Sequence, residues 1–209
     1  ASPTTLDAAK LDLLIDAGLC SVEMGIQTGS PAMRKRFRRP ESDARVLAGA
    51  KLRHERRGRL LPPDYHVIID SPWETTEDKL DTVRLLARLP KPYGLAIASL
   101  LYFPETELYR QAKAEGRIHD EETEIYRRPF YIPPRRDYPS FLLYLLTFQH
   151  IPGALYRALL SPRAIAFFTR ANPTWLYKLA YPVGEACRLV AKGLAALAGG
   201  DIGRITGYF

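Results

Sequence analysis

Three short apolar segments, each followed by a helical pattern, are the feature that most limits which folds this chain can adopt. Residues 21–26, 65–69 and 94–102 are rich in apolar and β-branched side chains, and helical periodicity follows each of them. Strands this apolar are usually parallel and covered by helices. The pattern predicts an α/β fold, either part of a (β/α) barrel or half of a doubly wound sheet.

Capping residues and glycines mark where the intervening helices begin and end. Thr4 and Asp7 resemble a capping box, Gly18 ends the first helix, and Pro31 suits the first position of the second. Further helices are expected at residues 42–57, 77–88 and 105–115, and Thr76 is expected to cap the helix at 77–88.

The character of the chain changes after Gly116. Residues 119–138 are charged and proline-rich, which is typical of a long connection. Beyond them, bulky apolar residues recur at helical spacing, and Pro182 is expected to kink or split the last helix. We expect three parts: an α/β part at residues 1–118, the connection, and an all-helical extension at residues 139–209, with helices at 140–149, 154–160, 162–170 and 173–197.

Composition and charge exclude several classes of protein. The chain has 209 residues, is 46% hydrophobic, carries a net charge of +7, and has no apolar run of about 18 residues, so no membrane-spanning helix is expected. Its two cysteines, Cys20 and Cys187, are too far apart for a local metal motif, and a reducing cytoplasm fits best.

Arginines are concentrated at residues 34–39 and 53–59. These clusters have three interpretations: a solvated helix face, a nucleic-acid patch or a site for anionic ligands. Because no nucleic-acid-binding motif accompanies them, nucleic acid is disfavoured as a partner.

Polar residues stand at the ends of the predicted strands, where parallel α/β folds bind ligands. Gln27 and Ser30 follow the first strand, and a Gln amide suits ribose hydroxyls because it both donates and accepts. His66 lies in the second strand and Asp70 follows it. Each also has a structural reading: a strand-to-helix turn, a satisfied buried histidine, or an aspartate that bonds its own backbone.

The order and spacing of these segments resemble the radical S-adenosylmethionine (SAM) superfamily, and within it the proteins that also carry a cobalamin-binding domain. The resemblance covers about residues 5–118 and rests on five segments. These are a helix ending in Ala17-Gly18, the strand exit from Val22 to Ser30, Arg39-Pro40, the second strand exit from Ile68 to Thr75, and the segment from Phe103 to Tyr109.

The resemblance implies the C-terminal portion of a partial (β/α) TIM-like barrel, containing its last three strands, followed by the helical extension. It also implies that Gln27 contacts the SAM ribose, that Arg39 binds the SAM carboxylate, and that Ser30 and His66 complete the cofactor site. A guanidinium matches a carboxylate bidentately, so the role of Arg39 is chemically sensible.

The chain departs from the family in three places. Asp70 and Glu105 stand where the family has glycine, and the C-x3-C-x2-C motif that binds a [4Fe–4S] cluster is absent. That motif precedes the matching segments in the family, so we expect the chain to be a fragment whose cluster ligands lie upstream of Ala1.

The function expected of the parent is reductive cleavage of SAM at a [4Fe–4S] cluster for radical chemistry, or cobalamin-dependent methylation, on a small-molecule or lipid-like substrate. Flavodoxin or ferredoxin would serve as the electron donor. The alternative is a non-catalytic, degenerate barrel that acts as a binding module. The aromatic-rich extension either packs against the barrel or gives a cytoplasmic protein peripheral contact with a membrane.

Overall fold

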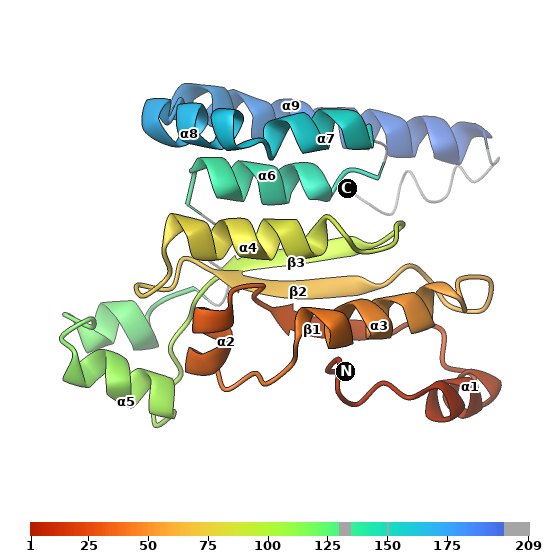
Figure 1. Ribbon diagram of the computed structural model, residues 1–209, viewed down its shortest axis with the longest axis horizontal. Coiled ribbons are helices and arrows are strands. Elements are labelled where there is room, and N and C mark those ends of the chain that lie inside the picture. Colours follow the sequence, from red (N-terminus) through yellow and green to blue (C-terminus); the bar gives the residue numbers. More distant parts are fainter. Residues whose placement is uncertain (130–134, 150, 199–209) are drawn as a thin grey trace.

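The computed structural model describes residues 1–129, 135–149 and 151–198, which form an α/β fold around a three-stranded parallel sheet (Figure 1). The strands are β1 (Glu23–Gln27), β2 (Asp64–Ile69) and β3 (Gly94–Ser99), in the order β1-β2-β3. α3 (Asp43–His54) joins the first pair and α4 (Thr76–Leu86) joins the second. The α/β class and the positions of the three strands were predicted from the sequence.

One face of the sheet is covered and the other is open. Val46 of α3 and Leu80 of α4 share a buried core with Met24, Tyr65 and other strand residues. On the opposite face, side chains such as Gln27, His66 and Ala96 are half-buried or exposed. The expectation that helices would cover these strands therefore holds for only one face among the described residues. The alternation in β1 and β2 is that of a sheet with only one face packed.

The remaining helices have the following bounds. They are α1 (Ala8–Asp16), α2 (Pro31–Arg36), α5 (Glu107–Ala114), α6 (Tyr138–Leu146), α7 (Gly153–Leu159), α8 (Pro162–Ala171) and α9 (Thr174–Ala198), with a short π-helix at Glu122–Tyr126.

Local side chains fix the helix starts. The Asp7 carboxylate accepts a 3.0 Å hydrogen bond from Lys10 N, so α1 begins after Asp7 and not at Thr4. Thr75, not Thr76, caps α4 and forms a capping box with Asp78. Both corrections move a start by a few residues and leave the helices themselves in place.

The helical extension packs on the outer side of α4. In Figure 1, α6 lies on the side of α4 away from the sheet, and α7, α8 and α9 lie beyond α6. Tyr138, Leu142 and Tyr177 belong to the same core as the strands, so the extension and the sheet share one hydrophobic core. α9 continues through Pro182, so the helix is not split there. Residues 130–134 of the expected connection and 199–209 of the extension lie outside the described residues.

Residues with left-handed backbone end β1, follow β2 and precede α5. Gln27 ends β1 with φ 66°, Asp70 follows β2 with φ 59°, and Glu105 precedes α5 with φ 65°. Residues other than glycine rarely adopt this backbone conformation, whereas glycine adopts it freely. The strand exits are therefore the places where the backbone path is most tightly specified.

Candidate functional site

A polar hollow of about 390 Å³ lies on the open face of the sheet. Its lining comes from β1, β2, the segment after α2 and the start of the chain. The lining residues are Ala1, Ser2, Glu23, Gly25, Gln27, Arg39 and His66. The hollow thus brings together three of the four side chains that the sequence assigned to a cofactor, and its volume is in the range of small-molecule sites.

The position of Gln27 depends on an irregularity in β1. The ladder between β1 and β2 shifts register between Gly25 and Gln27, as at a β-bulge, and such irregularities re-aim a side chain. The Gln27 amide folds over Gly25, where a Cβ would lie 2.6 Å from Gln27 Nε2, so a side chain at position 25 would displace the amide. Gln27 Oε1 is buried and has no hydrogen-bond partner among the described residues. An unpaired buried acceptor of this kind is costly unless a ligand satisfies it.

Arg39 differs from the arginines around it. Arg34 pairs with Asp43 at 2.6 Å, Arg36 with Glu115 at 3.7 Å, and Arg38 with Glu107. Arg39 is half-buried, and no carboxylate in the described part of the chain lies within ion-pair distance of its guanidinium. Its charge is therefore available to an anion in the hollow.

His66 and Glu23 form another polar part of the lining. His66 Nε2 lies 3.4 Å from Glu23 Oε2, and the two side chains are 44% and 67% exposed. This exposed pair can donate to and accept from a ligand, but contributes little to stability.

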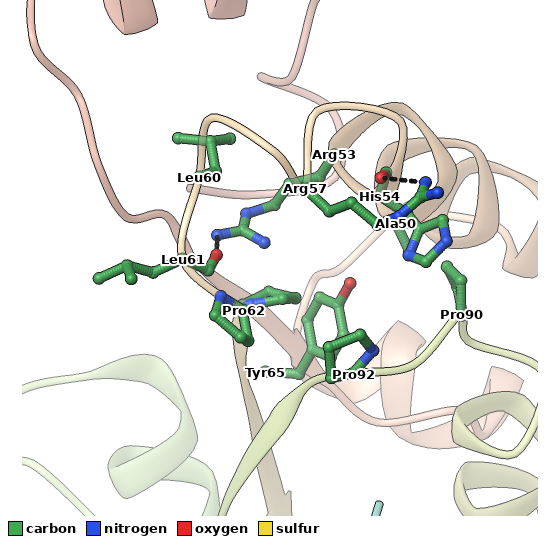
Figure 2. A pocket seen from close by; sticks show the side chains of 11 residues that line it. Ala50, Arg53, His54, Arg57, Leu60, Leu61, Pro62, Tyr65, Pro90 and Pro92 are labelled. Atoms are coloured by element: carbon green, nitrogen blue, oxygen red, sulfur yellow. Dashed lines mark hydrogen bonds between the residues drawn. The ribbon is translucent and has the colours of Figure 1, made fainter. Parts of the chain in front are cut away.

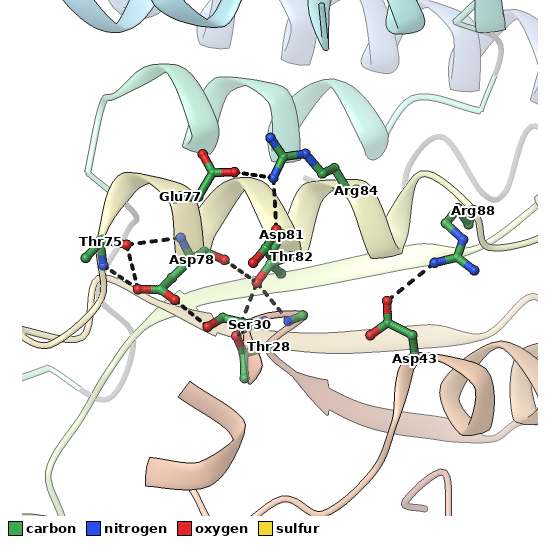
Figure 3. A network of polar contacts seen from close by, with 11 residues as sticks. Thr28, Ser30, Asp43, Thr75, Glu77, Asp78, Asp81, Thr82, Arg84 and Arg88 are labelled. Atoms are coloured by element: carbon green, nitrogen blue, oxygen red, sulfur yellow. Dashed lines mark hydrogen bonds and ion pairs between the residues drawn. The ribbon is translucent and has the colours of Figure 1, made fainter. Parts of the chain in front are cut away.

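Ser30 does not reach the hollow. Its side chain is fully buried, accepts a 3.2 Å hydrogen bond from Met33 N at the start of α2, and donates to Asp78 of α4 (Figure 3). Thr28 Oγ1 lies 3.2 Å from Thr82 Oγ1 beside it. Polar residues after a strand serve helix capping as well as ligand binding, so the sequence could not separate the two roles.

The neighbouring glycine has a packing role in the same turn. A Cβ on Gly29 would lie 2.6 Å from Asp81 O and 2.6 Å from Thr82 Cα, and Gly29 N donates to Thr82 Oγ1 at 2.8 Å. The turn after β1 is thus joined closely to α4, which fixes the exit of the strand that carries Gln27.

Asp70 is the centre of a buried ionic network at the end of β2. Its carboxylate accepts from Lys79, from Ser99 Oγ at 2.8 Å and from Arg135 N at 2.7 Å. Lys79 also donates to Asp137 at 2.6 Å, at the start of α6. Neither Lys79 nor Asp137 was predicted as part of a site, because the bond between them joins residues 58 positions apart in the chain.

Burial and hydrogen bonding act in opposite directions on this network. Burial raises the pKa of Asp70, but bonds from Lys79, Arg135 N and Ser99 outweigh it, so the pKa is lowered. Burial lowers the pKa of Lys79, but Asp137 and Asp70 outweigh it, so the pKa is raised. Glu74, which accepts a 2.6 Å hydrogen bond from Asp70 N, has its pKa raised to about 7 by burial.

A second cavity, of about 160 Å³, lies at the opposite ends of the strands (Figure 2). Prolines and leucines make up much of its wall, together with Arg53, His54, Arg57 and Tyr65. Arg53 Nη2 donates to Leu61 O at 2.6 Å, while Arg53 Nε and the Tyr65 hydroxyl have no partner among the described residues. Ligand sites of parallel sheets lie at the carboxyl ends of strands, and of the two cavities only the hollow with Gln27 reaches such an end, so it is the better candidate site.

Comparisons with known proteins add no family. No family model matches the chain, and no curated protein matches it. The residues that the structure describes contain no group of three or more His, Cys, Asp or Glu side chains that could hold a metal ion. Cys20 and Cys187 are both free and exposed, in the segment after α1 and in α9.

Proposed function

We propose that this chain supplies the SAM-binding wall of a radical SAM enzyme. The observation that carries the proposal is the meeting of Gln27, Arg39 and His66 around one hollow. The three residues come from separate segments, and the family resemblance had assigned each of them to the cofactor.

The side chains in the hollow suit SAM. The unpaired Gln27 Oε1 would accept a hydrogen bond from a ribose hydroxyl, and the unpaired Arg39 guanidinium would bind the methionine carboxylate. His66, with Glu23 beside it, would contact the polar rim of the ligand. When bound, SAM would supply the adenosyl group for radical chemistry; the residues of this chain would orient it.

The backbone at two departures from the family supports the finer fold proposal, that these are the last three strands of a partial (β/α) barrel. Asp70 and Glu105 replace family glycines, and both have the left-handed backbone that glycine permits. On the free edge of β1, Ala1 N donates to Glu23 O at 2.7 Å and Gly25 N donates to Ala1 O at 3.1 Å. This is the bonding of a parallel neighbour, so the edge of β1 accepts a further parallel strand.

The [4Fe–4S] cluster does not fit the residues of this chain. Three thiolates are required, and the sequence has two cysteines in distant segments. The cluster ligands and any cobalamin would belong to other parts of the parent protein, the electron donor would be a separate protein, and this chain alone would have no radical activity.

A SAM titration tests the proposal. We expect SAM to bind the purified chain, and Arg39→Met to weaken SAM about tenfold while leaving the Kd of adenosine unchanged, because adenosine has no carboxylate. Gln27→Ala should weaken both ligands, since both carry the ribose. Isothermal titration calorimetry of the two ligands measures these changes.

Arg38→Met is the matched control, because Arg38 is exposed and pairs with Glu107 outside the hollow. It should leave both Kd values unchanged. Equal weakening of SAM and adenosine by Arg39→Met would contradict the role of Arg39. Adenosine binding as tight as SAM in the wild-type chain would favour the alternative, a degenerate barrel that binds nucleosides without catalysis.

A further inference from the structure

α9 has two different sides. One side packs inward: Tyr177 is fully buried, and the ring of Tyr181 stacks on that of Tyr144 with 4.2 Å between centroids. The other side carries large apolar side chains that are 52–67% exposed. Five of them form the apolar stripe: Trp175, Leu179, Val183, Val190 and Leu194; Leu189, which is 67% exposed, lies at its edge.

The spacing of the stripe keeps it on one side of the helix. At 3.6 residues per turn its five members fall within about a third of the helix circumference, opposite Tyr177 and Tyr181. The stripe extends about 28 Å along the axis. Soluble monomers rarely expose a continuous apolar surface of this size, so the stripe is expected to have a partner.

The charge around the stripe indicates the partner. Residues 151–198 contain six basic residues and one acidic residue, Glu185, which pairs with Arg188 at 3.0 Å. Arg157, Arg163, Arg170 and Lys178 are exposed, and no carboxylate among the described residues pairs with them. An apolar face in a layer whose one carboxylate is paired, and whose unpaired charges among the described residues are positive, suits a surface of anionic lipids.

The position of the stripe in the fold suits a flat partner. α7, α8 and α9 form the outermost layer, on the far side of α6 and α4 from the sheet (Figure 1). Phe167 of α8 and Leu155 of α7 are also more than half exposed in this layer. No helix in the described ranges is long and apolar enough to cross a membrane, so α9 would lie along the surface.

We propose that α9 docks on an anionic membrane surface, with the apolar stripe inserted among the lipids and the basic residues of α7, α8 and α9 at the headgroups. The proposal is independent of SAM binding. It favours peripheral membrane contact over the view that the whole extension serves only to cover the α/β part. α6 packs against α4, and the outer side of α9 contacts the membrane.

Vesicle flotation of the full chain tests the proposal. At 50 mM NaCl we expect binding to phosphatidylcholine vesicles that contain 30% phosphatidylglycerol to be at least about tenfold tighter than to pure phosphatidylcholine vesicles, and to weaken at 500 mM NaCl. Leu179→Asp with Val190→Asp should reduce binding at least about tenfold. Arg163→Glu with Lys178→Glu should remove the preference for the anionic vesicles.

The control is Leu13→Asp in α1, because Leu13 is 69% exposed and far from α9 in the fold. It should bind as the wild type does, and circular dichroism should show that every variant is folded. Wild-type chain that fails to float with anionic vesicles at low salt would overturn the proposal. So would stripe variants that bind normally, or variants that instead lose self-association measured by light scattering.

Discussion

Asp70 adopts the left-handed backbone that the resemblance assigns to a glycine at this position. Its side chain also makes contacts that glycine cannot make. Its backbone has φ 59°, which aspartate tolerates better than most residues because its short side chain bonds locally. Its carboxylate joins Lys79, Ser99 and the backbone of Arg135. These bonds compensate for the strained backbone, so the departure at Asp70 preserves the strand exit.

Glu74 gives the protein a pH-dependent stability. Its folded-state pKa of about 7 is above the ordinary value of 4.5, so the folded protein binds more protons than the unfolded one between these values. The contribution is present below about pH 4.5 and is lost as pH rises through about 7. Relative to Glu74→Gln, the wild-type unfolding free energy should fall by about 2 kcal/mol from pH 5 to pH 8. Denaturant titrations of both proteins measure this, and parallel pH curves would contradict it.

The network of Lys79 joins three elements. Lys79 lies in α4, Asp70 follows β2, and Asp137 caps α6, where its other oxygen accepts from Ser140 N at 2.9 Å. The Lys79 side chain is only 7% exposed, so its ammonium group has little contact with water, and the two carboxylates compensate for the lost hydration. The pairing therefore fixes the position of the helical extension relative to the sheet.

Lys79→Met should destabilise the protein strongly. The substitution keeps the length of the side chain but leaves Asp70 and Asp137 without their cation, which typically costs about 3–5 kcal/mol for a buried pair. Chemical denaturation measures the loss. Lys113→Met is the matched control, because the Lys113–Glu121 pair is exposed and its loss should cost less than about 1 kcal/mol. Equal effects of the two substitutions would show that the network adds no stability.

The elements were predictable where local chemistry determines them. The strand expected at residues 65–69 is Asp64–Ile69, and the helix expected at 173–197 is Thr174–Ala198. The packing of α6 on α4 was not predictable, since it depends on pairs such as Lys79 and Asp137 that are far apart in the chain. In the candidate site, Gln27 was proposed from its place after a strand and Arg39 only through the resemblance, and both line the hollow. Ser30 lies outside the hollow and caps α2, because capping and ligand binding use the same residue types.

At the scale of the whole molecule, the sheet and the helical extension behave as one unit. Leu142, Leu143 and Leu146 of α6 are buried in the core that includes Leu80 and Val83 of α4. α4 is therefore covered on both sides, by the sheet and by α6. Neither part has a complete apolar interior of its own.

Removal of residues 138–209 should make the remaining chain aggregate. The truncation exposes the outer side of α4 and removes Tyr138, which is 1% exposed in the intact chain. Size-exclusion chromatography with light scattering should show large species for the truncated chain. A monodisperse truncated chain that melts cooperatively would contradict the shared core.

The left-handed residues at the strand exits also affect how such proteins are recognised. Asp70 and Glu105 have the positive φ that glycine adopts freely, without being glycine. A sequence signature that requires glycine at such positions would reject a chain in which another residue adopts a positive φ. A signature written in torsion angles would accept such a chain. It would allow glycine, asparagine and any residue whose side chain gains a compensating bond.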